Sequence, residues 1–248
     1  MSKVLLVTGG SRGIGAAICR LGARDGYDVA INYAGRADAA EAVAADVRKA
    51  GRKAITLQGD IRDPASVAAM FDRAARELGY VSAFVSNAGV IHKGAALADI
   101  PAEEIKRVID IDLTAHLICL GEAVRRMGKS RGGRGGAIVT ISSMASLLFG
   151  AGGFQPYAAA KGGIDVVTQG LGKEVAGDGI RVNGLRPGLI DTEMQDDTGM
   201  EKRIERLAAQ IPIGRGGTAE EVAEAALWLL SDKASYVAAT LFNVSGGR

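Results

Sequence analysis

An apolar run near the N-terminus, Val4–Val7, stops at a glycine-rich turn, and a helical pattern begins at Ala16. Four consecutive apolar residues are typical of a short strand buried on both faces. A strand, a glycine turn and a helix in this order point backbone N–H groups and a positive helix end at one place, which favours a phosphate. Side chains at Gly9, Gly13 or Gly15 would keep a pyrophosphate away from the backbone. The spacing Gly-x-x-x-Gly-x-Gly differs from the commoner Gly-x-Gly-x-x-Gly, so a turn that binds nothing remains an alternative.

The rest of the 248-residue chain alternates short β-branched runs with longer Ala-rich helical patterns. This alternation predicts right-handed βαβ crossovers and an α/β class, doubly wound Rossmann fold with a seven-stranded parallel sheet flanked by helices on both faces. No repeat or linker divides the chain, so we expect one domain over residues 1–248. The expected strands are 4–7, 29–31, 54–57, 83–85, 137–141, 180–185 and 237–244.

Local signals mark several helix ends. Asp63 followed by Pro64 predicts an N-cap with proline at the first helical position. Thr218 and Glu221 have the spacing of a capping box. Pro101–Met127 is predicted as one long helix, in which Asp110–Thr114 could introduce a kink.

Charge and cysteine content narrow the choice of partners. Thirty Lys and Arg against 28 Asp and Glu give a net charge of +2, which argues against nucleic acid or an anionic membrane as the main partner. Cys19 and Cys119 lie in apolar helical patterns and are expected to be buried, reduced thiols. The sequence shows no signal-peptide pattern and no long apolar run, so we expect a cytoplasmic protein. The expected partner is a small molecule.

Tyr157 and Lys161 have the i, i+4 spacing that places two side chains on one helix face. A tyrosine ionises near pH 10, too high for proton transfer at neutral pH, and a neighbouring ammonium lowers that pKa. The pair is therefore a candidate general acid/base, and the three alanines between them leave room for a ligand. A partly buried Tyr beside a Lys with no catalytic role is the alternative.

The end of the second strand bears on the choice of dinucleotide. NAD-selective sites place Asp or Glu there to bind the ribose 2′-hydroxyl, whereas this chain continues Asn32-Tyr33-Ala34-Gly35-Arg36. Arg12 in the glycine turn and Arg36 could flank a 2′-phosphate instead. Arg36 is the weaker candidate, since it could equally be a solvated charge at a helix start. We therefore predict NADP(H) rather than NAD(H).

Six motifs in order over the whole chain resemble those of the short-chain dehydrogenase/reductase family. They are Thr8-Gly9-x-x-x-Gly13-x-Gly15, Asp60, Asn87-Ala88-Gly89, Ser143, Tyr157-x-x-x-Lys161 and Pro187-Gly188. The resemblance implies that Ser143 orients the substrate oxygen, although Ser142 remains an alternative because the loop to Tyr157 varies in length. It also implies that Lys161 holds the nicotinamide ribose.

The same resemblance implies a cofactor site spread along the chain. Asp60 corresponds to an adenine contact, with a turn residue that bonds its own backbone as the alternative. Ile190 and Thr192 correspond to contacts of the nicotinamide carboxamide, through the backbone and the side chain respectively. The residues predicted to bind the cofactor are Gly9, Ser11, Arg12, Gly13, Ile14, Gly15, Asn32, Arg36, Asp60, Ile61, Asn87, Ala88, Gly89, Tyr157, Lys161, Pro187, Gly188, Ile190 and Thr192.

Asp112 departs from the family pattern, which usually has Asn at this position in support of a water-linked proton path to the active-site Lys. Asp is nearly isosteric but cannot donate an amide hydrogen bond. Its charge would hold Lys161 as an ammonium and weaken the field that lowers the Tyr157 pKa. We predict retained activity with a shifted pH profile and count Asp112 with the catalytic group; a purely structural Asp112 is the alternative.

Two further segments carry expectations. The basic loop 125–134 is expected to be solvated, although it could attract an acidic carrier or coenzyme. A substrate lid is expected at about 189–212. His92 and His116 lack metal-ligand spacing, so no metal site is predicted.

The sequence therefore predicts an NADP(H)-dependent oxidoreductase of ketones and secondary alcohols. A 3-oxoacyl thioester reductase acting on a carrier-protein or coenzyme A ester is the second enzymatic reading. A non-catalytic NADP-binding regulatory or scaffolding protein is the alternative from another class. By the family resemblance, the protein is expected to be a homotetramer or a homodimer.

Overall fold

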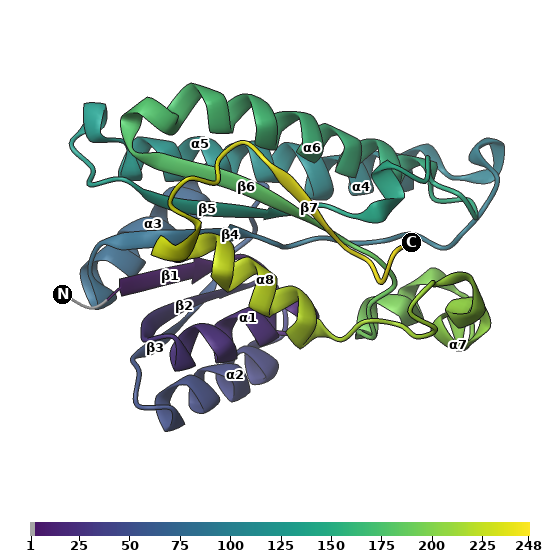
Figure 1. Ribbon diagram of the computed structural model, residues 1–248, viewed down its shortest axis with the longest axis horizontal. Helices are drawn as coiled ribbons and strands as arrows, with labels where there is room; N and C mark the ends of the chain where they lie inside the picture. Colours follow the sequence, from purple (N-terminus) through teal and green to yellow (C-terminus); the bar gives the residue numbers. More distant parts are fainter. Residues whose placement is uncertain (1–2) are drawn as a thin grey trace.

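One parallel sheet forms the centre of the structure, a computed structural model that describes residues 3–248 (Figure 1). Its strand order is β3-β2-β1-β4-β5-β6-β7, and every neighbouring pair is parallel. The strands are β1 (Lys3–Val7), β2 (Tyr27–Tyr33), β3 (Ala54–Gln58), β4 (Val81–Ser86), β5 (Gly136–Ile141), β6 (Ile180–Pro187) and β7 (Leu241–Val244). The order reverses between β1 and β4, and in such sheets ligands bind beyond the carboxyl ends of the strands at that reversal. The predicted doubly wound α/β fold is confirmed.

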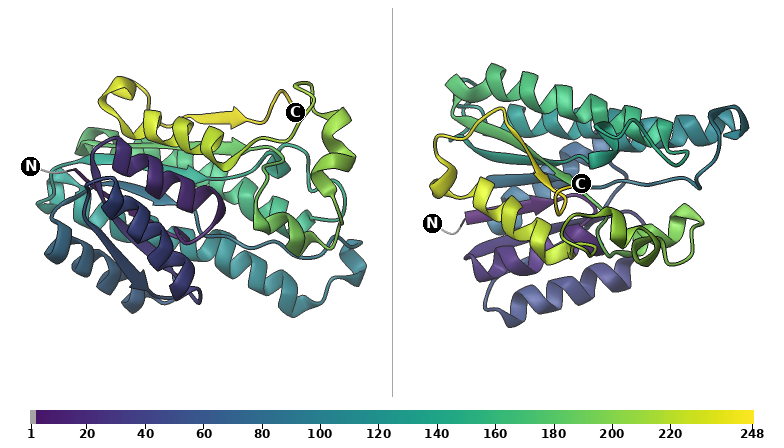
Figure 2. Two further views of the ribbon diagram at one scale, coloured as in Figure 1. Left: turned by 90° about the horizontal axis from the view of Figure 1, so that it is seen from below. Right: turned by 45° about the vertical axis from the view of Figure 1, so that its right-hand side comes forward.

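Helices cover both faces of the sheet (Figures 1 and 2). One face packs against α1 (Gly13–Arg24), α2 (Ala37–Lys49) and α8 (Ala219–Leu230). The other packs against α3 (Pro64–Leu78), α5 (Ala115–Met127) and α6 (Gln155–Val175), with α4 (Ala102–Ile109) beside α6. A short helix, α7 (Arg203–Leu207), lies outside these layers, beyond the carboxyl ends of the strands. Two apolar cores result, one on each face of the sheet.

The predicted helix starts are confirmed. The Asp63 carboxylate accepts hydrogen bonds from the backbone N–H groups of Ala65 and Ser66, at the start of α3. The Thr218 and Glu221 side chains each bond the other's backbone N–H, which completes a capping box at the start of α8.

The predicted helix 101–127 is continuous, but one π-helical turn, Asp110–Thr114, joins α4 to α5. A π turn inserts an extra residue and shifts which side chains face inward, and such turns are frequent at functional sites. Asp112 lies in this turn and is completely buried. The segment predicted as a possible kink is therefore the place where helical geometry changes.

The predicted last strand, 237–244, was too long, because β7 covers only Leu241–Val244. The Asn183 side chain donates to the Val237 carbonyl and accepts from the Thr240 N–H, so a side chain takes up two backbone groups that a ladder would use. Ala239 also has a φ of +58°, which is incompatible with an extended strand. The other strands match their predicted positions with ends shifted by one or two residues.

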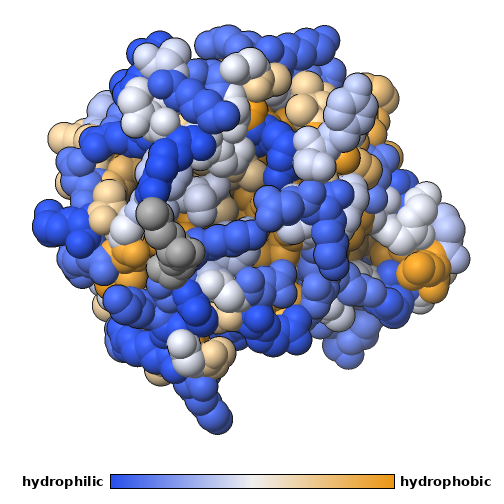
Figure 3. Space-filling model, turned by 60° about the vertical axis from the view of Figure 1, so that its left-hand side comes forward, coloured by the Kyte–Doolittle hydropathy of each residue, from blue (hydrophilic) through white to orange (hydrophobic). Residues whose placement is uncertain are grey.

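The amino-terminal edge of the sheet carries the basic loop 125–134. The loop ends just before β5 begins, and the strands of a parallel sheet all begin at the same edge. That edge is predominantly hydrophilic where it comes forward in Figure 3. A six-residue strand spans roughly 20 Å, so the loop lies about that far from the carboxyl ends of the strands. Attraction of an acidic carrier or coenzyme by this loop stays a prediction.

Cys19 and Cys119 are buried free thiols, as predicted, and burial raises the pKa of both, that of Cys119 to about 12. No helix among residues 3–248 is long and apolar enough to span a membrane.

Candidate active site

A cavity of about 480 Å³ lies beyond the carboxyl ends of the strands. The predicted site residues that line it are Gly9, Ser11, Arg12, Gly13, Ile14, Gly15, Asn32, Arg36, Asp60, Ile61, Asn87, Ala88, Gly89, Ser143, Tyr157, Lys161, Pro187, Gly188, Ile190 and Thr192. Asp112 is not part of the lining and lies behind it, against Lys161 and Gly89. Residues more than 180 positions apart in the sequence thus form one site.

The glycine turn between β1 and α1 is shaped by contacts that exclude side chains. Gly9 has a φ of +64° and Gly13 a φ of +50°, values that L side chains rarely adopt. A Cβ on Gly15 would lie 2.3 Å from the Gly9 carbonyl oxygen, and one on Gly9 would lie 2.8 Å from the Ala88 Cα. The cavity is thus bordered by bare backbone next to the start of a helix, which fits the phosphates of a dinucleotide.

Asn87 and Thr8 join β1 to β4 below the glycine turn. The Asn87 side-chain amide donates to the Thr8 and Gly9 carbonyls at 2.9 and 3.2 Å, and the Thr8 hydroxyl accepts from the Asn87 N–H. These bonds cross-link the two neighbouring strands and fix the turn relative to the loop Asn87–Gly89.

His116 is buried in α5 and holds that loop from below. Its Nε2 is 2.7 Å from the Ala88 carbonyl, and its Nδ1 is 2.8 Å from the Ser86 hydroxyl. Nε2 therefore donates to Ala88, and Nδ1 accepts from Ser86. Burial first, and the charge of Lys161 second, lower its pKa to about 3, so the ring is neutral at physiological pH. Sequence patterns gave no signal for this role.

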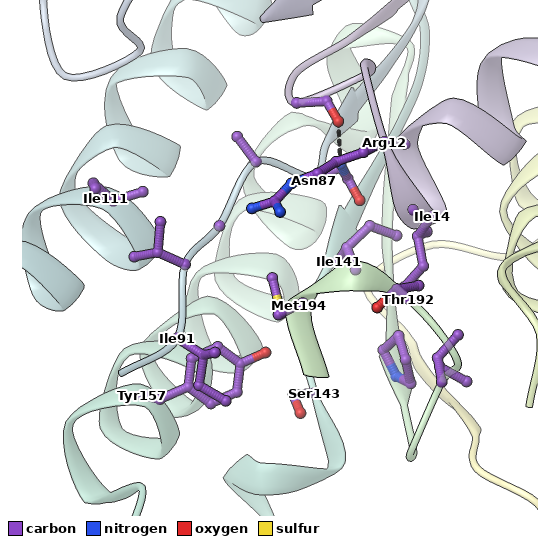
Figure 4. Close-up of a pocket in the computed structure, with 18 of the residues that line it drawn as sticks. Arg12, Ile14, Asn87, Ile91, Ile111, Ile141, Ser143, Tyr157, Thr192 and Met194 are labelled. Carbon is purple, nitrogen blue, oxygen red and sulfur yellow. Dashed lines mark hydrogen bonds between the residues drawn. The ribbon is translucent and has the colours of Figure 1, made fainter. Parts of the chain in front are cut away.

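Two arginines border the cavity around the end of β2. Arg12 extends from the glycine turn across the cavity (Figure 4), and Arg36 directly precedes α2. No acidic residue follows β2 before Arg36. A guanidinium of Arg12 lies 3.6 Å from the Asp197 carboxylate, and both side chains are partly exposed. This donor set suits a phosphate better than a bare ribose hydroxyl pair.

Asn32 and Asp60 have their polar groups engaged within the protein. The Asn32 amide donates to the Leu57 and Gly59 carbonyls and accepts from the Gly9 N–H. The Asp60 carboxylate accepts hydrogen bonds from the backbone N–H and the guanidinium of Arg62. These bonds, mainly the one from the guanidinium, lower the pKa of Asp60. The turn geometry that we considered for Asp60 is therefore observed. Asp60 still lines the cavity with Ile61.

The loop after β6 forms the opposite wall. The Gly188 N–H donates to the Val244 carbonyl at 2.9 Å, and a Cβ on Gly188 would lie 2.8 Å from the Ser245 Cα. Thr192 faces the glycine turn, since its Cγ2 lies 3.3 Å from where a Cβ on Gly13 would be. The Ile190 carbonyl accepts from the Gln195 side chain. The two walls of the cavity thus meet at Gly13 and Thr192.

Tyr157 and Ser143 point into the same part of the cavity, from the first turn of α6 and from the end of β5 (Figure 4). Ser142 behaves differently, because it is buried and its hydroxyl donates to the Lys161 carbonyl at 3.1 Å. Of the two serines, Ser143 lines the cavity beside Tyr157 and lowers the pKa of its hydroxyl, while the Ser143 oxygen accepts from the Ala145 N–H. The geometry favours Ser143 over Ser142.

Lys161 is the third member of this group. Its ammonium lies 5.6 Å from the centre of the Tyr157 ring, 3.2 Å from the Ile141 carbonyl and 3.2 Å from the Asp112 carboxylate. Asp112 also accepts from the Val90 N–H. A buried ion pair therefore stands one helical turn from the candidate acid/base.

Burial dominates the ionisation of these groups. The pKa of Tyr157 is raised overall. Burial, the largest cause, and the charge of Asp112 raise it, whereas the charge of Lys161 and the interaction with Ser143 lower it. Burial alone would lower the pKa of Lys161, but Asp112 and Tyr157 raise it above its ordinary value. Burial raises the pKa of Asp112 against the opposing charge of Lys161. The predicted lowering of the Tyr157 pKa by Lys161 is present but smaller than the effect of burial.

Sequence reasoning missed the substrate end of the cavity. Its apolar lining comes from loops without helical or strand periodicity, so no sequence pattern could identify it. The apolar lining residues are Ile91, Met144, Leu148, Phe154 and Met194. Two arginines, Arg203 and Arg248, also line the cavity. No group of three His, Cys, Asp or Glu side chains within residues 3–248 is arranged to hold a metal ion.

Comparison with known proteins identifies the class. A family model described as enoyl-(acyl carrier protein) reductase matches residues 9–248. The uncharacterized oxidoreductase YgfF of Escherichia coli (strain K12) is 47% identical over 245 residues, which is 99% of each chain. A cis-4-hydroxycyclohexanecarboxylate dehydrogenase of Sinomonas cyclohexanicum is 40% identical, covering 99% of this chain and 96% of that protein. The 3-oxoacyl-(acyl-carrier-protein) reductase FabG of Staphylococcus aureus is 35% identical, over 100% of this chain and 98% of that protein.

Solved structures agree. A short-chain dehydrogenase of Burkholderia cenocepacia J2315 in complex with NADP superposes with a TM-score of 0.90 at 33% identity, covering 99% of this chain and 97% of that one. A 3-ketoacyl-(acyl-carrier-protein) reductase of Brucella melitensis complexed with NADH superposes with a TM-score of 0.91 at 27% identity. The superposition covers 99% of this chain and 98% of that one. The chain therefore belongs to the short-chain dehydrogenase/reductase family. It is an oxidoreductase of CH–OH and C=O groups that uses a nicotinamide cofactor.

Proposed function

We propose that this protein is an NADPH-dependent reductase of ketones, which also oxidises the corresponding secondary alcohols. The observation that carries the proposal is the convergence of Tyr157, Ser143 and Lys161 on one cavity with the glycine turn. The nicotinamide, when bound, supplies the hydride in reduction or accepts it in oxidation.

In reduction, Ser143 donates a hydrogen bond to the carbonyl oxygen and orients it toward Tyr157. As the carbonyl carbon gains the hydride, the electron pair of the C=O π bond moves to oxygen, which takes the proton from the Tyr157 hydroxyl. Lys161 stabilises the tyrosinate left behind. Because burial raises the Tyr157 pKa, the phenol carries its proton at neutral pH and is ready to act as an acid. Oxidation needs the tyrosinate and is therefore favoured by higher pH.

Asp112 is a positioning residue in this proposal. Its carboxylate holds the Lys161 ammonium at 3.2 Å and the loop beyond Gly89 through the Val90 N–H. It does not line the cavity itself, so it acts on the reaction through Lys161 and through the field at Tyr157.

NADPH rather than NADH is supported by Arg12 and Arg36 at the cavity wall and by the absence of an acid between β2 and Arg36. Among the relatives, one structure is in complex with NADP and another with NADH, so the arginines carry this choice. The segment 189–212 would act as the lid of the same cavity. The family resemblance supports a homotetramer or a homodimer.

A 3-oxoacyl thioester reductase is the second candidate, supported by the relatives named as 3-oxoacyl-(acyl-carrier-protein) reductases. The relative that acts on a hydroxycyclohexanecarboxylate supports small cyclic substrates instead. The apolar lining at the substrate end fits a compact hydrocarbon body.

The test is a panel of cyclic ketones, linear ketones and 3-oxoacyl thioesters monitored by NADPH absorbance and repeated with NADH. We expect turnover of ketones with NADPH at higher kcat/KM than with NADH. Cofactor binding without turnover of any compound would favour a non-catalytic NADP-binding protein. A marked preference for NADH would overturn the assignment built on Arg12.

A further inference from the structure

Two arginines, Arg203 and Arg248, line the cavity, and neither is paired with an acidic side chain within residues 3–248. We propose that they form a subsite for an anionic group of the substrate, so that the preferred substrates are ketones or secondary alcohols that carry a carboxylate. This inference rests on the proposed function, because it specifies the substrate class of the same cavity.

Arg203 begins α7, in the segment expected to form the lid. Its guanidinium stacks on Phe154, 4.8 Å from the ring centre, and one of its terminal nitrogens donates to the Gln195 side chain at 2.9 Å. Its Nε is buried and has no hydrogen-bond partner among the described residues. A buried donor without a partner is unfavourable, so a ligand that accepts a hydrogen bond from this nitrogen would be stabilised here.

Three other partly buried arginines of this protein have their positive charge compensated. The Arg186 guanidinium lies 2.8 Å from the Asp165 carboxylate, and Arg107 pairs with Glu104. Arg181 donates to three backbone carbonyls at the end of α8. Within residues 3–248 no carboxylate of an acidic side chain lies within 4.0 Å of the Arg203 guanidinium. Since an uncompensated buried charge is costly, Arg203 stands out as a cation arranged for a ligand.

Arg248 adds a second positive charge to the same wall. Burial lowers the pKa of Arg203, and the charge of Arg248 lowers it further, while Tyr157 opposes both. The two positive charges therefore repel each other. The Ile213 N–H donates to the Gly246 carbonyl, so this part of the chain lies beside the lid (Figure 2). An anion between Arg203 and Arg248 would relieve the repulsion.

The position of Arg203 favours a short substrate. Phe154, on which it stacks, is three residues before Tyr157 and packs in one apolar cluster with it. An apolar body over Phe154 would thus place its carbonyl at Tyr157 and its anionic group at Arg203. A phosphopantetheine thioester also carries an anion, but its phosphate is separated from the reactive carbonyl by a long arm. A planar carboxylate close to the carbonyl matches the guanidinium better.

The test compares matched substrates and matched variants. The probes are 4-oxocyclohexanecarboxylate and its neutral methyl ester, with acetoacetyl-coenzyme A and neutral acetoacetyl-N-acetylcysteamine as the thioester pair. The variants are Arg203→Gln, Arg203→Lys and Arg248→Gln. Arg206→Gln is the control, because Arg206 is an exposed arginine on the same helix and does not line the cavity.

We expect the wild-type protein to have a higher kcat/KM for the carboxylate than for its ester. Arg203→Gln should raise KM for the carboxylate by about 10- to 100-fold, the range of a lost charge-assisted hydrogen bond, with little change for the ester or in KM for NADPH. Arg203→Lys should keep part of the preference, Arg248→Gln should have a smaller effect, and Arg206→Gln should have none. Thermal unfolding of each variant checks that it is folded.

A second measurement tests binding of the anionic group independently of catalysis. Calorimetric titration of 4-hydroxycyclohexanecarboxylate into the NADP⁺-bound Tyr157→Phe protein should show binding that the added Arg203→Gln change weakens. If no ketone is reduced but this binding depends on Arg203, the proposed function fails and the subsite stands. Equal kcat/KM for acid and ester, or a preference that survives in a folded Arg203→Gln protein, overturns the subsite. An Arg203-dependent preference only within the thioester pair would identify phosphate, not carboxylate, as the anion.

Discussion

The glycine turn and the segment 189–212, which we propose to be the lid, face each other across one cavity, yet different forces hold them. The turn, Gly9–Gly15, is fixed by backbone contacts so close that a single methyl group would collide with a carbonyl oxygen. The lid segment, 189–212, consists of short 3₁₀ turns and the five-residue α7, and many of its side chains are exposed. The turn is thus specified by sterics, whereas the lid is specified by a few side-chain contacts.

This difference matches what each region has to recognise. A dinucleotide presents the same phosphates to every protein that binds it, so bare backbone and a helix end suffice. Substrates differ, and discrimination among them comes from individual side chains such as Arg203 and Phe154. We therefore expect changes in the turn to affect folding and cofactor binding, and changes in the lid to affect substrate preference.

The largest effect is expected at Tyr157, which lines the cavity that both regions border. Tyr157→Phe removes the proton donor and should lower kcat by about 10²- to 10⁴-fold, the usual contribution of general acid catalysis. Dissociation constants for NADPH, measured by fluorescence titration, should change little. Retention of more than half of the wild-type kcat would contradict the role of Tyr157.

Within the turn, Gly15→Ala should break the packing itself. Its Cβ would lie 2.3 Å from the Gly9 carbonyl oxygen and 2.6 Å from the Asn87 side-chain nitrogen. We expect the free energy of unfolding to fall by about 1–3 kcal/mol, with weaker NADPH binding. Gly177→Ala is the control, because no atom lies within 4 Å of its would-be Cβ, and it should change stability by less than about 0.5 kcal/mol. Equal unfolding midpoints in denaturant for both variants would show that the turn tolerates a side chain.

Charge in the turn should decide cofactor choice. Arg12→Gln should lower kcat/KM for NADPH by about 10- to 100-fold and leave that for NADH nearly unchanged, since only NADPH carries the 2′-phosphate. Arg24→Gln, which removes an exposed arginine of α1 paired with Glu224, serves as the control and should alter neither value. Parallel losses with both cofactors would mean that Arg12 acts on the turn as a whole.

Asp112→Asn tests the field at Tyr157. Asp112 raises the Tyr157 pKa, so its removal should lower that pKa and let the tyrosinate form at lower pH. The rise of alcohol oxidation with pH should therefore shift to lower pH, while kcat at neutral pH changes by less than about tenfold. The readout is the pH profile of kcat, with Asp110→Asn in the same π turn as the control. A profile identical to wild type at every pH would leave Asp112 a structural residue.

The smallest effect is expected from the lid contact with the turn. Asp197 pairs with Arg12 at 3.6 Å while both side chains are partly exposed, so Asp197→Asn should change stability by no more than about 1 kcal/mol. Because Asp197 competes for the Arg12 guanidinium, its loss should lower KM for NADPH slightly, and added salt should reduce the difference. A higher KM would indicate instead that Asp197 orients Arg12 for the cofactor.

Most of the fold was predictable because its signals are local. Apolar runs, the Asp63 cap and the Thr218–Glu221 capping box each depend on residues within a few positions of one another, and the structure confirms them. The last strand was predicted too long because Asn183, more than 50 residues away, bonds the backbone at Val237 and Thr240. A contact of that range leaves no trace in a local pattern.

The order of motifs in the sequence determined the family, the parallel sheet and the group of Tyr157, Ser143 and Lys161, because short-range geometry and strand order place them at one edge. Only the tertiary structure shows why Ser143 is the better candidate than Ser142, since the Ser142 hydroxyl is buried and bonds the Lys161 carbonyl. It also decided that His116 supports the loop at Ala88 and that Arg203 lies over Phe154. These assignments depend on burial and on side chains from distant segments, which exist only once the chain is packed.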